Sequence, residues 1–359
     1  MQVDYIIVGQ GICGTFLSYE LQKAQQSFIV IDESNPASAS KVASGVINPV
    51  TGRRIVKTWM IDELMPFAWN AYTAIGNSLQ IDCIAEKQVV DCFATPQMRL
   101  AFLDRYKNDT TYLSLPENDN DWQQYLQYEF GYGIIQPCYW VDIQLLLTRQ
   151  RAHLLQTKQL REERFDLPAL ELKKDAVVYK DITAKKIICC DGVAGFNNPW
   201  FSNLPYAASK GEALLVAIPH LPSTHIIKKG YSLVPWSNTT ATENVFWLGS
   251  TYLWEFEDVN PSPGFYQFAQ NWLRQSIKLP FTILDHLAAI RPATLERRPF
   301  VGFHPVHNNL GILNGMGTKG CSLAPYFAHQ LVNHMLYNGP ISPDADVQRF
   351  KRILSRNSL

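Results

Sequence analysis

The chain has 359 residues, 47% of them hydrophobic, which excludes a disordered protein and provides core material for about two domains. Its 32 basic and 32 acidic side chains give zero net charge, so the basic excess typical of nucleic-acid-binding proteins is missing and only a local basic patch is left open. The first residues include neither a basic n-region nor an apolar h-region, so we expect no signal peptide. The sequence has no apolar run of about 18 residues and no CxxC pair among its seven cysteines. Its histidines do not cluster with cysteines at metal-ligand spacing. We therefore expect a cytoplasmic protein with reduced thiols, no membrane span and no metal site.

The first elements are a strand, a glycine turn, a helix and a second strand. Residues 5–8 are a continuous apolar run, typical of a buried parallel strand. A GxGxxG sequence follows at once, formed by Gly9, Gly11 and Gly14. Residues 12–25 repeat apolar side chains at helical spacing, and the apolar residues 28–31 end at Asp32, 18 residues after Gly14. This order predicts a dinucleotide-binding unit.

The chemistry of dinucleotide binding explains why each glycine and Asp32 stand where they do in this unit. Gly9 allows a tight turn, Gly11 lets the backbone approach a pyrophosphate, and Gly14 lets the helix pack closely on the strand. The helix N-terminus offers N–H groups and a positive dipole end to phosphate. Asp32 would accept hydrogen bonds from ribose hydroxyls. The motif alone leaves FAD and NAD open, but a second GxGxxG for a nicotinamide cofactor is absent from the sequence.

The middle of the chain predicts a second sheet. Residues 212–218 and 245–249 are strand-like, and residues 264–276 predict a helix. Residues 108–121 are polar and predict a loop, and the basic tail from 344 to 359 predicts a solvated helix.

A second glycine-rich loop lies in the last third of the chain. Residues 314–320 follow a strand-like run and precede a helix expected over 322–336, with Ser322 as a possible cap. A helix N-terminus aimed at a flavin ring would stabilise negative charge on its pyrimidine side.

These blocks carry a resemblance to a known family. The chain resembles the glycine oxidase and D-amino-acid oxidase group of FAD-dependent oxidoreductases, the DAO family. The similar blocks are the opening unit with Asp32 and residues 40–49, 187–192, 289–294 with 298–302, and 314–325. The resemblance implies an α/β fold in which a Rossmann-like FAD-binding domain is interleaved with an antiparallel-sheet substrate domain, as in glutathione-reductase-type FAD proteins. The expected FAD domain is 1–75, 140–208 and 288–340, the substrate domain is 76–139 and 209–287, and 341–359 is a C-terminal tail.

The resemblance also implies which residues hold FAD. In addition to the three glycines and Asp32, the expected contacts are Ile12, Cys13, Glu33, Ala39, Ser40, Ser44, Gly45, Val46, Phe165, Gly192, Gly315, Met316, Gly317, Thr318, Lys319, Gly320, Cys321 and Ser322. Some family members attach the flavin to a cysteine after the arginine that corresponds to Arg291. Residues 292–295 contain no cysteine, so we expect FAD to be bound without a covalent link.

Four residues are expected on the substrate side. Arg291 matches the family's arginine that pairs with a substrate carboxylate, for which a guanidinium fork is suited. Tyr231 matches a tyrosine that lines the pocket in glycine-oxidase-like members, and Tyr252 and Lys319 are further candidates. The chain has Thr318 where glycine oxidases have an arginine, which puts glycine itself in doubt as the substrate.

The implied activity is oxidation of a C–N bond in a small amine or amino acid. The substrate's Cα–H would face flavin N5 and pass a hydride as the C=N bond forms, with the protein supplying orientation and electrostatics. The reduced flavin would then give electrons to oxygen or another acceptor. Two alternatives remain: an FAD-dependent oxidoreductase acting on a wobble-uridine side chain of tRNA, which the chain also resembles, and a non-catalytic flavin-binding protein.

Overall fold

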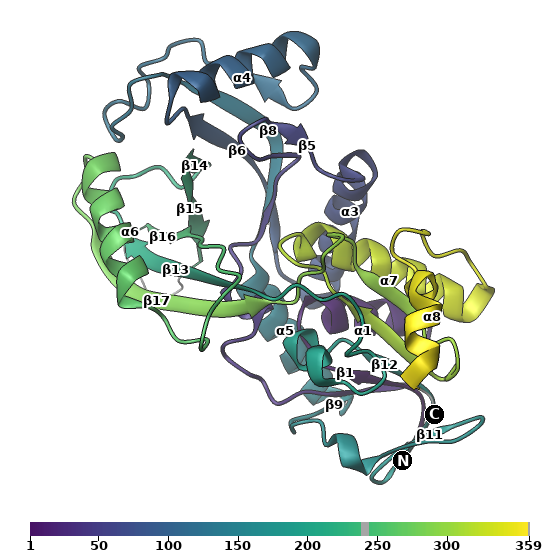
Figure 1. Ribbon diagram of the computed structural model, residues 1–359. Helices are drawn as coiled ribbons and strands as arrows, with labels where there is room; N and C mark the ends of the chain where they lie inside the picture. Colours follow the sequence, from purple (N-terminus) through teal and green to yellow (C-terminus); the bar gives the residue numbers. More distant parts are fainter. Residues whose placement is uncertain (238–243, 358–359) are drawn as a thin grey trace.

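The computed structural model describes residues 1–237 and 244–357, and its chain forms two large sheets that lie side by side (Figure 1). The first sheet carries the dinucleotide-binding unit. The second sheet extends from it, with helices α4 and α6 packed on opposite faces (Figure 1). The mixed α/β architecture agrees with the fold class expected from the sequence.

The first sheet has a parallel centre. Strands β19, β12, β1, β2 and β9 run parallel to one another in that order, with β18 antiparallel to β19 and the β10–β11 hairpin antiparallel to the start of β12. Its strands are β1 (Gln2–Val8), β2 (Phe28–Ile31), β9 (Leu160–Arg161), β10 (Leu170–Leu172), β11 (Val177–Tyr179), β12 (Ile182–Cys189), β18 (Phe300–Phe303) and β19 (Leu310–Asn314). The carboxyl ends of β1, β2, β12 and β19 therefore meet at one edge, where ligands bind in open α/β sheets.

The two faces of this sheet are both buried. Tyr5 and Ile7 face a core formed with helices α1, α3, α5 and α7, whereas Ile6 and Val8 face the opposite core. Because successive side chains of β1 point to opposite faces and both faces are buried, every position of this run has to be apolar. The helices are α1 (Ile12–Lys23), α3 (Ile61–Leu79), α5 (Ile143–Gln156) and α7 (Gly320–Tyr337), and the short α2 (Ala39–Val42) lies in the loop after β2.

The C-terminal tail differs from the solvated helix that its basic residues predict. Segment 347–357 forms two short 3-10 helices, η3 (Val347–Phe350) and η4 (Ser355–Asn357), around α8 (Lys351–Leu354). Val347 and Leu354 are fully buried in the second core, beside Phe300. The prediction was wrong because two apolar side chains at this spacing are enough to dock the tail on the sheet.

The second sheet is antiparallel except for one pair. Its order is β17-β13-β16-β15-β14-β6-β8-β3, with β7 also paired to β8, and among the described strands of this sheet only β14 and β6 run parallel. Its strands are β3 (Val46–Ile47), β6 (Ile84–Cys92), β7 (Leu113–Ser114), β8 (Tyr132–Val141), β13 (Ser209–Ala217), β14 (His225–Lys229), β15 (Tyr231–Trp236), β16 (Val245–Gly249) and β17 (Thr282–Arg291). The expected loop over 108–121 contains β7.

The two faces of the second sheet have different neighbours. Helix α6 (Pro263–Ser276) covers one face, with Phe265 and Leu273 in its core. The other face carries Trp247, whose Nε1 donates to the carbonyl oxygen of Val42 at 3.0 Å. This second face is therefore turned toward the loop after β2. The β4 (Val50–Thr51) and β5 (Val56–Lys57) hairpin and α4 (Pro96–Asn108) pack on the same side.

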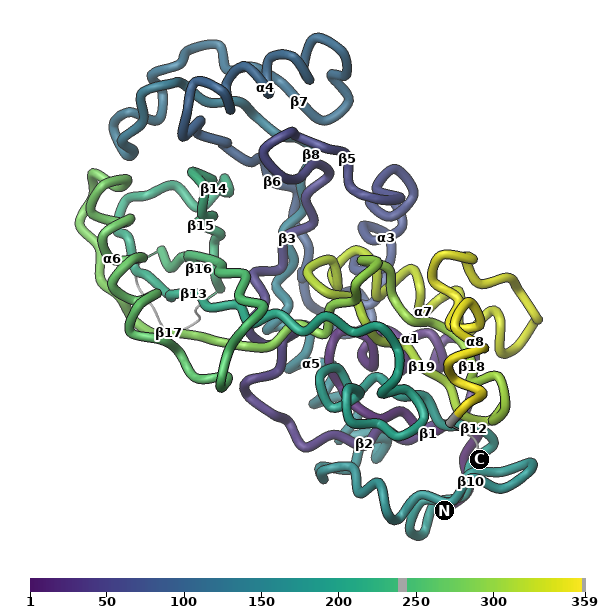
Figure 2. Tube along the Cα trace, viewed as in Figure 1, coloured from purple at the N-terminus to yellow at the C-terminus, as the bar shows by residue number. Residues whose placement is uncertain are grey.

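The chain crosses between the sheets more than once, as the trace in Figure 2 shows for the long segment between β2 and β6. Strand β8 runs through the domain boundary expected at 139/140, and β17 runs through the domain boundary expected at 287/288. The remaining short elements are η1 (Leu167–Ala169) and η2 (Gly192–Asn197). Within the described residues, no helix combines the length and apolar character needed to cross a membrane.

Candidate active site

The first glycine turn is built as its spacing predicts. Gly9 has φ +97°, and a Cβ there would lie 2.5 Å from the carbonyl oxygen of Cys190. A Cβ on Gly14 would lie 1.9 Å from the carbonyl oxygen of Gly9, so any side chain would separate α1 from β1. Gly11 is the N-cap of α1, and because it has no side chain it cannot cap the helix itself. The backbone N–H groups at this helix start are therefore presented at the sheet edge, as phosphate binding requires.

The loop after β2 closes over this helix start. The backbone N–H of Ile12 donates to Ser40 Oγ at 3.0 Å, so two residues predicted to contact the cofactor also contact each other. Ala39 and Ser40 begin α2, and Gly45, at φ +80°, packs so tightly that a Cβ would lie 1.9 Å from the carbonyl oxygen of Val141. Ser44 and Val46 flank that glycine, partly buried.

Asp32 lies at the end of β2 in a network that the sequence does not indicate. Its Oδ2 accepts the backbone N–H of Gln10 at 2.8 Å, and its Oδ1 accepts the backbone N–H of Ser34 at 2.7 Å. Oδ1 also forms a 2.7 Å salt bridge with Arg151 Nη1, on α5. Arg151 in turn binds Glu162 at 2.9 Å. The carboxylate is thus fixed beside the glycine turn, with one further acceptor direction on Oδ2 for a ribose hydroxyl.

The second glycine loop joins β19 to α7. Gly315 and Gly317 have φ +78° and +56°, and a Cβ on Gly315 would lie 2.8 Å from the side chain of Thr294. Helix α7 begins at Gly320, two residues earlier than expected, with Lys319 as its N-cap. Ser322 does not cap the helix, because its Oγ donates to the carbonyl oxygen of Lys319 at 3.0 Å. The uncapped start of α7 leaves N–H groups and a positive dipole end open to a ligand.

The other predicted cofactor residues surround this edge. Gly192 follows β12, and its carbonyl oxygen accepts from Asn314 Nδ2 at 2.9 Å. Cys13, Met316 and Cys321 are buried between the two helix starts, whereas Thr318 and Glu33 are exposed. Phe165 lies farther along, after β9, with its ring stacked on Tyr179 at 4.8 Å between centroids.

A partly buried carboxyl group links the end of β12 to the second glycine loop. Asp191 Oδ1 accepts from Asn314 Nδ2 at 2.9 Å, at the ends of β12 and β19. Burial raises the pKa of Asp191 to about 6, against the opposing hydrogen bonds from Asn198 and Asn314. An acid at this position holds the carboxyl edges of two parallel strands together.

Arg291 ends β17 on the face of the second sheet that is turned toward the loop after β2. Its Nη2 donates to Ser250 Oγ at 2.7 Å and to the carbonyl oxygen of Thr251 at 3.1 Å. The ring of Tyr252 lies 4.6 Å from its Cζ, a cation–π contact. Nη1 is buried and has no hydrogen-bond partner among the described residues. The site thus holds a partly buried cation whose Nη1 is buried and unpaired.

The guanidinium fits only because its neighbour lacks a side chain. A Cβ on Gly211 of β13 would lie 1.8 Å from Arg291 Nη2 and 2.3 Å from its Cζ. Burial lowers the pKa of Arg291 from its ordinary value of 12.5, and the arginine nevertheless remains charged.

Lys319 and Tyr231 lie apart from one another. Burial lowers the pKa of Lys319 to about 8, and the thiol groups of Cys138 and Cys321 are its nearest titratable neighbours. Its ammonium forms no ion pair with the described residues. Tyr231 packs on the α6 face of the second sheet, 5.2 Å from the ring of Phe268, so the structure does not bring it to Arg291.

Several residues of the site carry no signal in the sequence. Arg151, Gly211 and Ser250 belong to no motif, and their roles come from contacts between elements far apart in the chain. Asp191 stands next to a recognisable strand end, and an acid after an apolar run is a signal that could have been used.

The edge described here fits FAD. The starts of α1 and α7, a fixed aspartate beside the first turn, and glycines whose Cβ atoms would collide with backbone make up a cradle for a long dinucleotide; α7 has no side-chain cap, and at α1 Ser40 Oγ accepts the N–H of Ile12. No group of three or more metal-ligating side chains is found within 1–237 and 244–357.

Comparison with known proteins identifies the family. The model of the DAO family, described as FAD dependent oxidoreductase, matches residues 4–334. The chain therefore belongs to the DAO family of FAD-dependent oxidoreductases, and it is a flavoenzyme with FAD as its cofactor.

Solved structures share the fold at low identity. The chain is similar to iminodiacetate oxidase from Chelativorans sp. BNC1 (TM-score 0.73, 18% identity, covering 94% of this chain and 96% of that one). It is also similar to glycine oxidase from Geobacillus kaustophilus (0.72, 18%, 95% and 96%) and to glycine oxidase from Bacillus cereus (0.75, 14%, 94% and 96%). These likenesses show that the chain has the fold of these enzymes.

Proposed function

We propose that the protein oxidises the C–N bond of a small amine that carries a carboxylate, and that Arg291 holds this carboxylate. The observation that carries the proposal is the buried Nη1 of Arg291, which has no partner among the described residues. A buried charged donor without a partner is costly, and a substrate carboxylate would remove that cost. The favoured substrate is therefore an amino acid or N-substituted amino acid.

The surrounding residues orient the guanidinium. Ser250 and Thr251 occupy Nη2, Tyr252 covers one face of the group, and Gly211 leaves room beneath it. An oriented arginine binds a carboxylate in one geometry, which places the rest of the substrate reproducibly.

Other groups of the chain supply electrostatics. Bound FAD would supply the hydride acceptor for this oxidation. The start of α7 and the ammonium of Lys319 provide positive charge at the second glycine loop, which favours negative charge developing there. Because the pKa of Lys319 is about 8, part of this charge is lost in mildly alkaline solution.

The test is reduction of the holoenzyme without oxygen. Flavin absorbance would be followed with glycine, sarcosine, iminodiacetate, longer amino acids, simple amines without a carboxylate, and tRNA. We expect bleaching by a carboxylate-bearing amine, and Arg291→Leu should slow it by about 30-fold to a few thousand-fold, since such a charge pair contributes about 2–5 kcal/mol. Bleaching by tRNA or by simple amines alone, unaffected by Arg291→Leu, would refute the proposal.

A further inference from the structure

A proline inside helix α7 leaves one backbone carbonyl group without its usual donor. In an α-helix, each carbonyl oxygen accepts from the N–H four residues further along the chain. For Cys321, the second residue of α7, that position is Pro325, which has no N–H. Because Cys321 and Pro325 are both buried, the carbonyl group needs another donor from within the protein.

Tyr72 of α3, the helix beside α7 in Figure 1, supplies that donor. Its hydroxyl group donates to the carbonyl oxygen of Cys321 at 3.0 Å, across 249 residues of sequence. The side chain of Tyr72 is fully buried, so its hydroxyl group also needs a partner in the protein. Removing the hydroxyl group would leave the carbonyl group of Cys321 with neither its helical donor nor the substitute.

The same tyrosine also contacts helix α1. Its ring lies 4.9 Å from the ring of Phe16, edge to face at 87°. Gly320 and Ile12 are the first residues of α7 and α1, and a Cβ on Gly320 would lie 3.3 Å from Ile12 Cγ2. The starts of the two helices therefore lie against each other, and Tyr72 contacts each helix within its first two turns.

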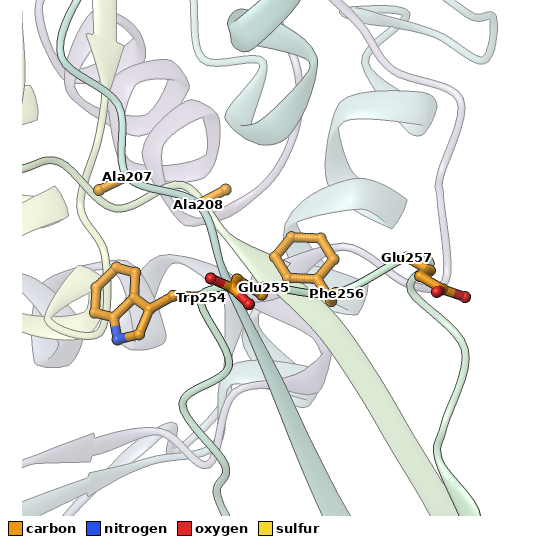
Figure 3. Close-up of a pocket in the computed structure, with 6 residues that line it drawn as sticks. All are labelled: Ala207, Ala208, Trp254, Glu255, Phe256 and Glu257. Atoms are coloured by element: carbon orange, nitrogen blue, oxygen red, sulfur yellow. The ribbon is translucent and has the colours of Figure 1, made fainter.

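This junction of α1, α3 and α7 is closed to solvent. Tyr72 and Phe16 expose none of their surface, and Cys321 exposes 8%. Figure 3 shows an open hollow of about 800 Å³, lined by residues 207–208 and 254–257. None of these six lining residues belongs to α1, α3 or α7. Tyr72 can therefore affect a ligand only through the helices that it contacts.

We propose that Tyr72 is a positioning residue for FAD: its hydrogen bond to Cys321 holds the start of α7 against the start of α1, where the cofactor cradle lies. A helix start binds negative charge through N–H groups that point at the ligand, so a start that shifts binds the cofactor less well. The inference concerns the cofactor alone and does not depend on the role proposed for Arg291.

Tyr72→Phe tests this because it removes the hydroxyl group and keeps the ring against Phe16. Titration of the apoprotein with FAD, followed by flavin fluorescence, measures the dissociation constant. We expect Tyr72→Phe to raise this constant about tenfold, because a buried carbonyl group that loses its only donor has effects of this size. The matched control is Tyr132→Phe, which removes another buried hydroxyl group that donates to a carbonyl oxygen, that of Asn118 at 3.2 Å, in the core under α6. This control should leave the FAD dissociation constant unchanged.

Pro325→Ala provides the second background, because an alanine restores the N–H that the carbonyl group of Cys321 lacks. In that background, Tyr72→Phe should change the FAD dissociation constant less than about twofold. An equal loss in both backgrounds would overturn the carbonyl contact as the cause. An unchanged constant in Tyr72→Phe alone would overturn the positioning role. If Tyr72→Phe does not fold, Tyr72→Phe/Pro325→Ala should fold and bind FAD, and its failure to do so would also overturn the proposal.

Discussion

Arg291 and Ser250 share a 2.7 Å hydrogen bond in which Nη2 donates and the hydroxyl oxygen accepts. The second hydrogen of Nη2 goes to the carbonyl oxygen of Thr251 at 3.1 Å. One end of the guanidinium is therefore saturated by the protein, and Nη1 is left without a hydrogen-bond partner among the described residues. Ser250 is thus a positioning residue for the proposed carboxylate anchor.

Ser250→Ala should raise the substrate concentration needed for half-maximal flavin reduction by roughly tenfold, because a hydrogen bond to a charged group contributes about 1.5–3 kcal/mol. The limiting rate of reduction should change less, since the hydride transfer itself does not involve the hydroxyl. Anaerobic stopped-flow reduction separates the two quantities. Ser250→Thr keeps a hydroxyl and should recover most of the affinity; if it behaves like Ser250→Ala, packing rather than the hydrogen bond is responsible.

Gly211→Ala tests the space beneath the guanidinium. The new Cβ would lie 1.8 Å from Nη2, so Arg291 must leave its observed position. A displacement of about 1 Å at a reacting site can cost about a hundredfold in rate, so we expect a loss of that order with the flavin spectrum retained. The control is Gly264→Ala in α6, where no described atom lies within 4 Å of the new Cβ. Equal rates in both variants would show that Arg291 has another workable position.

Asp32→Ala should weaken FAD binding and also lower the stability of the apoprotein. The carboxylate accepts from Gln10, Ser34 and Arg151, so its removal leaves donors without partners as well as removing a ribose contact. Each lost hydrogen bond to a charged group contributes about 1.5–3 kcal/mol. Flavin fluorescence titration measures the first effect and urea unfolding of the apoprotein the second. An unchanged FAD dissociation constant would place Asp32 outside the cofactor site.

The local elements of the fold could be predicted because short-range patterns determine them. The helix expected over 12–25 is found at Ile12–Lys23, and the strands expected over 28–31 and 245–249 have those bounds in the structure. Glycine spacing likewise indicates both turns, since steric collisions at Gly9 and Gly14 follow from the geometry of strand, turn and helix alone.

Contacts between distant segments could not be predicted in this way. Arg151 reaches Asp32 across 119 residues of sequence, and Ser250 reaches Arg291 across 41. The parallel pairing of β14 with β6 depends on how the connections pass between the sheets, which no hydrophobic period encodes. The resemblance to the family indicated Arg291, but the space that Gly211 leaves for it is visible only when β13 and β17 are paired.

FAD should be released when the yellow holoenzyme is precipitated with acid. Residues 292–295 contain no cysteine, and the thiol groups nearest the cradle are poor nucleophiles, because burial raises the pKa of Cys13 to about 12 and that of Cys321 to about 11. Absorbance of the supernatant measures the release. Flavin that stays with the precipitate would show a covalent bond, and mass spectrometry would then locate it.

The lowered pKa of Lys319 predicts how the stability of the apoprotein changes with pH. Burial lowers its pKa to about 8 from the ordinary 10.5, so the folded apoprotein binds its proton less tightly than the unfolded chain does. Below pH 8 both states are protonated, and the folded state carries the full cost of the buried charge, at most about 3 kcal/mol. Between pH 8 and 10.5 the unfolded chain holds more protons, so stability rises with pH, and above 10.5 the cost is gone.

Lys319→Met should therefore stabilise the apoprotein against urea at pH 7 by about 1–3 kcal/mol, because it keeps the volume of the side chain and removes the buried charge. The gain should shrink steadily between pH 8 and 10.5. The thiol groups coupled to Lys319 stay largely protonated in this range, because the pKa of Cys138 is about 12 and that of Cys321 about 11. Lys319→Arg keeps a charge throughout this range and should show no gain at any pH. A gain for Lys319→Met that is constant from pH 7 to 10 would mean that the ammonium is hydrated in the folded protein and keeps its ordinary pKa, which would refute the lowered pKa of Lys319.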